Sequence, residues 1–213
     1  MKFPQDARLY GIVDLGYCAF NRVESMASMM IAGGVDILQI RAKEQSENQI
    51  VDVARKVRSV LAGTGVPLII NDYPHLVPVI GADGAHVGQD DMSVAEARSL
   101  AGPGKIVGKS THSPGQARGA VMESPDYIGF GPLFATPTKP DYAPIGIKDI
   151  RRVHEELALP IFCIGGVKAE NLDSVLAAGA KRVVIVSGIL LANDVLGYTE
   201  SVVKKLRAEN FAT

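Results

Sequence analysis

The sequence predicts one (β/α)₈ barrel, also called a TIM barrel, that spans residues 1–213 as a single catalytic domain. Eight short runs rich in β-branched residues alternate with segments whose apolar residues recur every three or four positions. The runs are too apolar for one solvated face, which is typical of parallel strands covered on both sides. Polar residues gather where these runs end, and barrels of this class keep their active sites there. A doubly wound open sheet is the alternative architecture.

The eight runs and the intervening segments define the expected elements in chain order. The expected strands are residues 8–14, 35–41, 67–72, 83–88, 105–110, 126–131, 160–166 and 182–187. The expected helices are residues 22–34, 46–65, 93–102, 113–124, 148–158 and 168–180, several of which end in glycine, a common helix stop. The weakest helix follows residue 73, where Pro74 and Pro78 interrupt it. Ser93 and Ser113 stand where helix caps are expected.

The overall composition narrows the class of protein. The 213 residues are 47% hydrophobic and 21% charged, with a formal net charge of −1, which suits one sizeable core and disfavours a nucleic-acid surface. No apolar stretch reaches the roughly 18 residues of a membrane span, nor does the start resemble a signal peptide. Cys18 and Cys163 lack metal-ligand spacing and suit a reducing compartment without a disulfide. We therefore expect a cytoplasmic protein that acts on small molecules, without nucleic acid or membrane.

The stretch DILQIRAKE, residues 36–44, carries the first binding signal. Alternation along a strand places Gln39, Arg41 and Lys43 on one face and Leu38 and Ile40 on the other. An amide with two cations suits a phosphate or pyrophosphate, because guanidinium and ammonium groups bind oxyanions. The alternative is that both cations only extend from a strand end into solvent.

Asp72 and Asp91 follow the third and fourth strands, which are neighbours in a barrel. Carboxylates at such a place can hold Mg²⁺, which prefers oxygen ligands and often shares them with substrate phosphates. Alternatively, either carboxylate caps the helix that follows it, or both pair with Arg41 and Lys43. Ser93 directly precedes the fourth helix and is the better cap, which leaves Asp91 for another role.

Three further groups of residues stand at strand ends. Ser110, Thr111 and His112 follow the fifth strand without a spaced acid or base, so Ser110 is expected to donate a hydrogen bond rather than attack. His112 is either an acid/base group or a loop residue, and the other three histidines are interpreted as structural. The long loop 132–146 carries Thr136, Pro137, Thr138 and Lys139, which either close over an anionic ligand or form a stiff exposed loop. Glycines after strands seven and eight suit a backbone phosphate site.

Seven motifs in order resemble those of the thiamin phosphate synthase family: QIRAK, INDY, GADGAHVGQDD, VGKSTH, DYIGFGPLFATPTKPD, CIGGV and VVIVSGI. Each motif is weak alone, but together they cover nearly the whole chain. The resemblance implies coupling of 4-amino-5-hydroxymethyl-2-methylpyrimidine pyrophosphate to 4-methyl-5-(2-phosphoethyl)thiazole, with release of pyrophosphate by dissociation before the thiazole attacks. It also implies a homodimer.

The resemblance assigns roles to individual residues. It implies that the pyrimidine pyrophosphate is bound by Gln39, Ile40, Arg41, Ala42, Lys43, Asn71, Ser110 and Lys139. Of these, Arg41, Lys43, Ser110 and Lys139 form the catalytic group. For the thiazole phosphate it implies Thr136, Pro137, Thr138, Gly166, Val186 and Ser187. It assigns Asp72 and Asp91 to Mg²⁺.

Three positions depart from the family pattern. Ala42 stands where glutamate is common, Val13 where threonine is common, and Lys109 where a small apolar residue is usual. A related isomerase, the thiazole tautomerase, is the alternative function, with His112 as its acid/base group. A third hypothesis is that the protein is a non-catalytic sensor of thiazole phosphate or thiamin phosphate. The combined cations and carboxylates favour the synthase, because neither alternative needs them.

Overall fold

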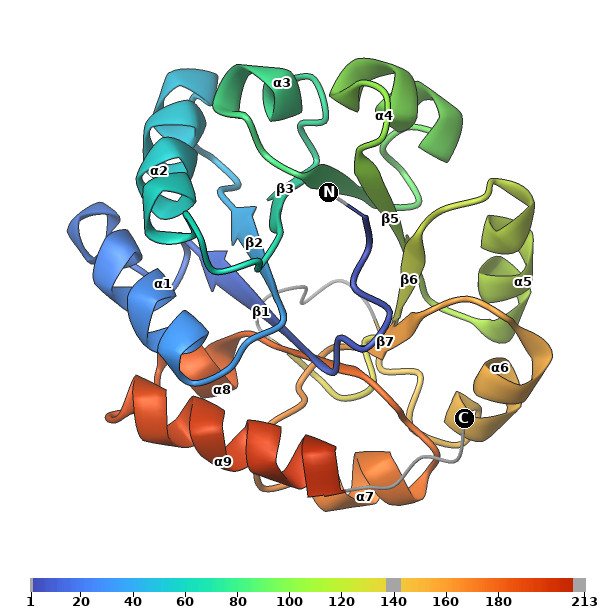
Figure 1. The fold of residues 1–213 in the computed structure, drawn as a ribbon. Coiled ribbons are helices and arrows are strands. Elements are labelled where there is room, and N and C mark those ends of the chain that lie inside the picture. The colour runs from blue at the N-terminus through green and yellow to red at the C-terminus, as the bar shows by residue number, and fades with distance from the viewer. Residues whose placement is uncertain (1, 137–142, 209–213) are drawn as a thin grey trace.

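The architecture is a closed barrel of eight parallel strands surrounded by helices (Figure 1). The computed structural model describes residues 2–136 and 143–208. Each strand pairs with its neighbours in sequence, and β1 pairs with β8 to close the sheet. The predicted (β/α)₈ barrel is confirmed, and the open sheet is excluded.

All eight predicted strands are present. They are β1 (Leu9–Asp14), β2 (Ile37–Arg41), β3 (Leu68–Asn71), β4 (Gly84–Val87), β5 (Ile106–Thr111), β6 (Tyr127–Phe130), β7 (Ile161–Cys163) and β8 (Val183–Ile185). The predicted helices correspond to α1 (Val23–Ala32), α2 (Glu47–Val60), α3 (Leu76–Ile80), α4 (Val94–Ala101), α5 (Pro114–Met122), α6 (Ile150–Glu156) and α7 (Leu172–Ala177). A 3-10 helix η1 (Phe20–Arg22) and the helices α8 (Ser187–Leu190) and α9 (Val195–Ala208) were not predicted.

Serine side chains begin three of the helices. Ser46 and Ser93 each accept the backbone N–H three residues on and form a capping box. Ser113 accepts the N–H of Gln116, with Pro114 in the first turn. The predicted caps at Ser93 and Ser113 are confirmed.

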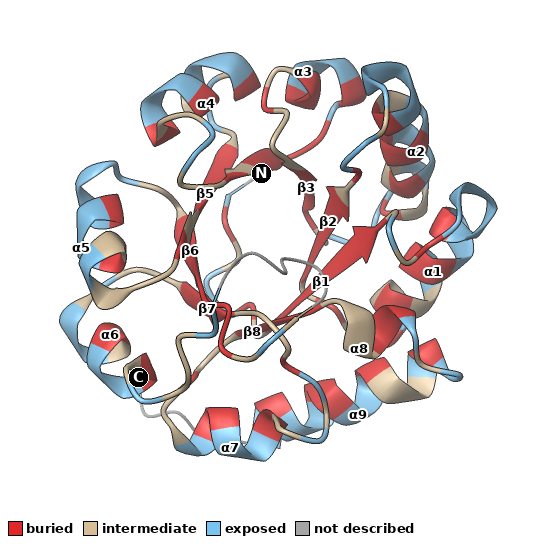
Figure 2. Ribbon diagram, turned by 180° about the vertical axis from the view of Figure 1, so that it is seen from behind, coloured by how far each residue is buried: buried red, intermediate tan, exposed pale blue. Residues whose placement is uncertain are grey.

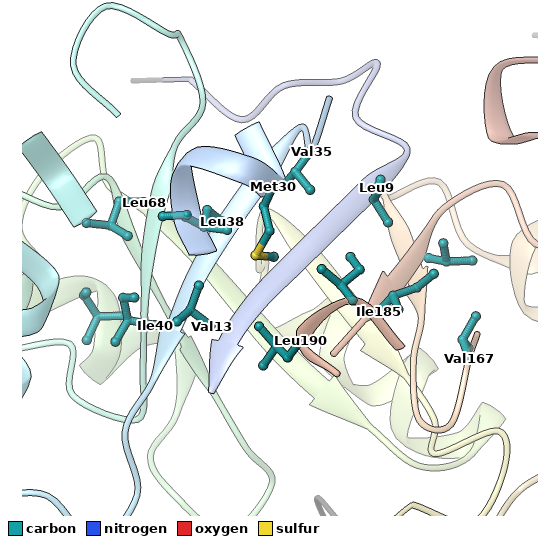
Figure 3. Packing of buried hydrophobic residues seen from close by; sticks show 14 of the residues in the cluster. Leu9, Val13, Met30, Val35, Leu38, Ile40, Leu68, Val167, Ile185 and Leu190 are labelled. Carbon is teal, nitrogen blue, oxygen red and sulfur yellow. The ribbon is translucent and has the colours of Figure 1, made fainter. Parts of the chain in front are cut away.

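Strand alternation divides the apolar residues between two layers. Leu38 and Ile40 belong to the outer core between strands and helices, and Figure 3 shows Leu38 near Met30 of α1 and Ile40 near Val13. Ile37 and Ile69 belong instead to the core inside the barrel. Figure 2 shows the result, with buried strands and helices that are exposed on their outer faces. Among the described residues, no helix has the length and apolar character required to cross a bilayer.

Aromatic rings fill the amino-terminal half of the barrel interior. The ring centroids of Phe3 and Tyr127 are 5.4 Å apart and nearly parallel, and Phe3 meets Phe162 edge-on at 6.3 Å. Tyr10 packs against both Tyr127 and Phe162. Because these rings close one end of the barrel, a ligand can reach the interior through the opposite, carboxyl-terminal end.

Gly108 on β5 makes room for one of these rings. It pairs directly with Tyr127 on β6, and a Cβ atom at this position would overlap the Tyr127 side chain. A glycine is therefore required here by close packing inside the barrel.

We predict that Gly108→Ala lowers the free energy of unfolding by about 1–3 kcal/mol, because the added methyl group overpacks the interior. The matched control is Gly119→Ala in α5, where a Cβ atom meets nothing within 4 Å. That substitution should raise the free energy of unfolding by about 0.5–1 kcal/mol. Urea denaturation of both variants measures the difference, and equal stabilities would contradict this packing.

Candidate active site

A cavity opens at the carboxyl-terminal end of the barrel, as predicted. About 910 Å³ of space lies between its walls, part of it open solvent. All eight strands contribute to its wall, through residues such as Ile12, Asn71, Gly129, Phe162 and Val184. The carboxyl ends of the strands therefore converge on one site.

The cavity brings together eight of the residues to which the family resemblance assigns a substrate-binding or catalytic role. These are Gln39, Arg41, Asn71, Ser110, Thr136, Gly166, Val186 and Ser187. Lys43, Asp72 and Asp91 follow their strands near the rim and do not line the cavity wall itself. The side chains of Ile40 and Ala42 pack in the outer core, so only their backbone can face a ligand. Pro137, Thr138 and Lys139 lie outside the described residues.

Arg41 is held by a short, buried ion pair with Asp14 at the end of β1. Its Nη1 lies 2.6 Å from Asp14 Oδ2, and the two side chains are only 13% and 2% exposed. The other carboxylate oxygen of Asp14 accepts the backbone N–H of Gly16 at 2.9 Å. Asp14 was given no role from the sequence, although it stands directly opposite Arg41 in the parallel register. The pair fixes the guanidinium in the cavity wall.

The two predicted metal ligands have other contacts in the structure. Lys43 Nζ lies 3.5 Å from Asp72 Oδ2, so the ion pair considered as an alternative is present. Asp91 Oδ2 accepts the backbone N–H of Gly88, whereas Ser93 caps α4. Asp91 is therefore not the cap of α4, as expected, but it already accepts a hydrogen bond that the sequence did not predict. Across residues 2–136 and 143–208, no group of three or more His, Cys, Asp or Glu side chains is arranged to hold a metal ion.

A chain of hydrogen-bonded side chains crosses the floor of the cavity. Gln39 Nε2 donates to Tyr10 Oη at 2.7 Å, and the two tyrosine hydroxyls lie 2.9 Å apart. Tyr127 Oη lies 3.0 Å from His86 Nδ1, and His86 Nε2 lies 2.9 Å from Ser110 Oγ. His86 was interpreted as structural, yet it lines the cavity. His86 pairs with Asn71 on β3, and paired residues of neighbouring strands point to the same side. This register puts both side chains on the inner face of the barrel.

Burial controls the protonation of the two tyrosines. Desolvation raises the pKa of Tyr10 above its ordinary value, outweighing the lowering effect of its hydrogen bonds with Tyr127 and Gln39. Desolvation also raises the pKa of Tyr127, with a further increase from the neighbouring Tyr10. Both phenols therefore keep their protons at neutral pH and can act as hydrogen-bond donors.

His112 contributes an oriented imidazole to the wall. Its Nδ1 contacts the carbonyl oxygen of Gly131, and its backbone N–H donates to Gln116 Oε1 at 2.7 Å. Because a carbonyl only accepts, Nδ1 carries the hydrogen, which makes Nε2 the basic nitrogen of the neutral ring.

Glycines shape the loop after β7. Gly165 and Gly166 have φ values of 92° and 65°, and a Cβ atom on either would meet Pro132 or Phe134. Asn171 Nδ2 donates to the carbonyl oxygen of Gly166 at 2.9 Å and holds the loop. This brings backbone close to the cavity next to Val186 and Ser187, which follow β8.

The three departures from the family pattern lie away from the cavity. Val13 and Ala42 are buried in the outer core. Lys109 is buried on the outer side of β5, where its Nζ donates to the Met92 carbonyl at 3.1 Å and lies 3.6 Å from Glu123 Oε2. These substitutions therefore leave the cavity wall unchanged.

The fold and the cavity define a class of protein: the (β/α)₈ barrels, whose enzymes keep their active sites at the carboxyl ends of the strands. A family model described as "Thiamine monophosphate synthase" matches residues 9–189. The chain belongs to this family, whose synthases are transferases.

Individual relatives agree with this assignment. A "Thiamine-phosphate synthase" from Gloeobacter violaceus is 42% identical over 164 residues, or 77% of this chain and about half (48%) of that protein. Another, from Chloroflexus aurantiacus, is 41% identical over 191 residues, covering 89% of this chain and 88% of that protein. The solved structure of a thiamine phosphate pyrophosphorylase from Pyrococcus furiosus is 26% identical, with a TM-score of 0.84 over 95% of this chain and 96% of that one.

We predict that Asp14→Ala lowers the free energy of unfolding by about 1.5–3 kcal/mol, because it removes a charged hydrogen-bond partner of Arg41, whose side chain is only 13% exposed. Asp173→Ala is the control, since it removes one side of an exposed pair with Lys205 and should change stability by less than about 1 kcal/mol. Adding Arg41→Ala to Asp14→Ala should recover part of the loss. Thermal denaturation of the four proteins gives the comparison, and equal losses at Asp14 and Asp173 would refute a buried ion pair.

Proposed function

We propose that the protein is a thiamine-phosphate synthase that couples a pyrimidine pyrophosphate to a thiazole phosphate and releases pyrophosphate. The observation that carries the proposal is the set of anion-binding groups around the cavity, above all Arg41 held by Asp14, in a chain of this family. A guanidinium can donate N–H groups to phosphate oxygens, and Ser110 and Asn71 add a hydroxyl and an amide to the same cavity wall.

The pyrimidine pyrophosphate would bind along β2, β3 and β5. Gln39, Arg41, Asn71 and Ser110 line the cavity there, and Lys43 stands at the rim. Ile40 and Ala42 would contribute backbone contacts only, because their side chains point into the outer core. Lys139 completes this proposed group from outside the described residues.

The thiazole phosphate would bind on the opposite wall. Gly166, Val186 and Ser187 lie together there, with Thr136 at the start of the sixth loop. Backbone N–H groups beside glycines can approach a phosphate closely, as the positive φ values of Gly165 and Gly166 allow. Pro137 and Thr138 belong to the same proposed set.

The donor set at the rim fits Mg²⁺. Asp72 and Asp91 follow β3 and β4 and offer hard carboxylate oxygens, and Mg²⁺ commonly uses one or two carboxylates together with substrate phosphates. A bound Mg²⁺ would neutralise part of the charge on the departing pyrophosphate. Lys43 would then exchange its contact with Asp72 for the same pyrophosphate.

The proposed reaction needs no protein nucleophile. The bond between the pyrimidine methylene and pyrophosphate breaks first, and the thiazole nitrogen then attacks the resulting cation. Arg41, Lys43, Ser110 and Lys139 stabilise negative charge as it gathers on the leaving group. The facing walls hold the thiazole nitrogen in line with the methylene.

Further parts of the proposal concern the whole chain. Residues 1–213 would act as a single catalytic domain, in the cytoplasm, on small-molecule substrates, and as a homodimer. Size-exclusion chromatography with light scattering measures the oligomeric state directly.

One observation favours a second candidate, thiazole tautomerisation. His112 lines the cavity with its Nδ1–H held by Gly131, so Nε2 can accept a proton. The deciding experiment offers the protein a thiazole phosphate tautomer alone, and separately both synthase substrates with Mg²⁺. Thiamin phosphate formation that His112→Asn largely retains supports the synthase. Isomerisation that this variant abolishes, without thiamin phosphate, establishes the tautomerase.

We predict that Arg41→Ala lowers kcat by about 10²–10³, since it removes a preorganised donor to the leaving pyrophosphate. Arg118→Ala, at an exposed ion pair on α5, is the control and should stay within about twofold of the parent, as expected for a distant surface change. Thiamin phosphate and free pyrophosphate are assayed together. An unchanged rate in Arg41→Ala would exclude the proposed pyrophosphate site.

A further prediction concerns the metal. Asp91→Asn keeps an oxygen for the Gly88 N–H but loses the charge, so it should raise the Mg²⁺ concentration for half-maximal rate by about tenfold or more. Asp52→Asn on the exposed face of α2 should leave that concentration unchanged. Titrating Mg²⁺ into the chelator-treated enzyme makes the comparison. Full activity in the presence of chelator would refute the metal requirement.

A further inference from the structure

We infer that His86 and Tyr127 are positioning residues that hold the Ser110 hydroxyl hydrogen toward the cavity, so that Ser110 donates to a bound anion. The inference rests on the proposed function, because it specifies how Ser110 would meet the pyrophosphate of the substrate. It concerns two residues that the sequence did not single out as functional. The direction of each hydrogen bond in the chain that crosses the cavity floor decides where the Ser110 hydrogen points.

The chain connects five strands through the barrel interior. It begins at Gln39 on β2, passes through Tyr10 on β1 and Tyr127 on β6, and reaches Ser110 on β5 through His86 on β4. The distances between the bonded atoms run from 2.7 to 3.0 Å. Gln39, Tyr10 and Tyr127 are at most 2% exposed, so solvent does not readily replace these partners.

The inner end of the chain sets its direction. Gln39 Nε2 can only donate, so Tyr10 Oη accepts at this contact and has one hydrogen to give. The neighbouring acceptor for that hydrogen is Tyr127 Oη. Tyr127 then directs its own hydrogen to His86 Nδ1. The raised pKa values of both phenols keep these two hydrogens in place at neutral pH.

The same order fixes the histidine tautomer. A neutral imidazole that accepts at Nδ1 carries its hydrogen on Nε2, and here Nε2 faces Ser110 Oγ at 2.9 Å. Ser110 Oγ therefore accepts from His86, and the Ser110 hydrogen is directed elsewhere. Since Ser110 lines the cavity, the direction that remains points to a ligand.

Packing supports the same arrangement. The His86 ring stacks on the Tyr127 ring, with centroids 5.5 Å apart and an interplanar angle of 29°. Gly108 leaves the space that the Tyr127 side chain occupies. The imidazole is thus held by a ring contact as well as by its two nitrogens.

The consequence is a donor of fixed direction in the site. Phosphate oxygens that carry negative charge only accept hydrogen bonds, so a preset hydroxyl donor needs no reorganisation when pyrophosphate departs. A reversed chain would make Ser110 donate to His86 and present lone pairs to the anion. The tautomer of His86 therefore decides whether Ser110 attracts or repels the leaving group.

The direct test is ¹⁵N NMR of the imidazole nitrogens in the full-length protein. The chain has four histidines, so the His86 signals are assigned by their loss in His86→Gln. We expect the neutral Nε2–H tautomer, and a shift toward a tautomer mixture in Tyr127→Phe, which removes the donor to Nδ1. An Nδ1–H tautomer, an imidazolium at neutral pH, or no change in Tyr127→Phe would overturn the inference.

Kinetics test whether His86 acts through Ser110. His86→Leu removes the donor and should lower kcat by about tenfold with little change in KM, whereas His86→Gln retains an N–H at the Nε2 position and should recover most of kcat. Circular dichroism melting curves confirm folding. Equal losses in both variants would mean that His86 serves packing alone.

A double-mutant comparison separates positioning from general damage. In a Ser110→Ala background, His86→Leu should cause no further loss of kcat, because the hydroxyl it orients is gone. Fully additive losses would overturn the inference. If the parent enzyme forms no thiamin phosphate, the proposed function fails, but the NMR measurement still decides the direction of the chain.

Discussion

Side-chain alternation along parallel strands is the constraint on which the whole site depends. Every second residue of a strand points into the barrel, and the closed order β1 to β8 brings all inward residues into one column. Aromatic rings from Phe3, Tyr10, Tyr127 and Phe162 fill the amino-terminal part of this column. The polar groups lie in the carboxyl-terminal part of the column. They need hydrogen-bond or ion-pair partners there, because apolar side chains cannot provide them.

The polar groups of the cavity have partners among the protein's own side chains. Arg41 has its counter-charge in Asp14, one strand away, and Ser110 has its partner in His86. Such pairs reduce the cost of burial and also fix direction, so that the groups are arranged before a substrate arrives. The rim is different, because Lys43 is half exposed and its contact with Asp72 is long enough to be exchanged.

Much of this could be predicted from the sequence. The alternating strand and helix patterns predicted the barrel. The polar residues at the strand ends predicted where the cavity lies, and Gln39, Arg41, Asn71 and Ser110 are among those that line it. The partners of these residues were harder to find, because Asp14, Tyr10 and Tyr127 meet them only through strand pairing across the barrel. The place of His86 in the cavity wall was missed for the same reason, because a single histidine within a strand does not reveal which side chains face it. The helices α8 and α9 after β8 were not predicted either.

The central claim is that the strand ends form one pyrophosphate site around Arg41 and Ser110. A crystal structure of the protein with Mg²⁺ and inorganic pyrophosphate tests it most directly. We expect phosphate oxygens within hydrogen-bonding distance of the Arg41 guanidinium and Ser110 Oγ, with the metal on Asp72 and Asp91. Pyrophosphate bound away from β2, β3, β4 and β5, with Arg41 still facing an empty cavity, would contradict it.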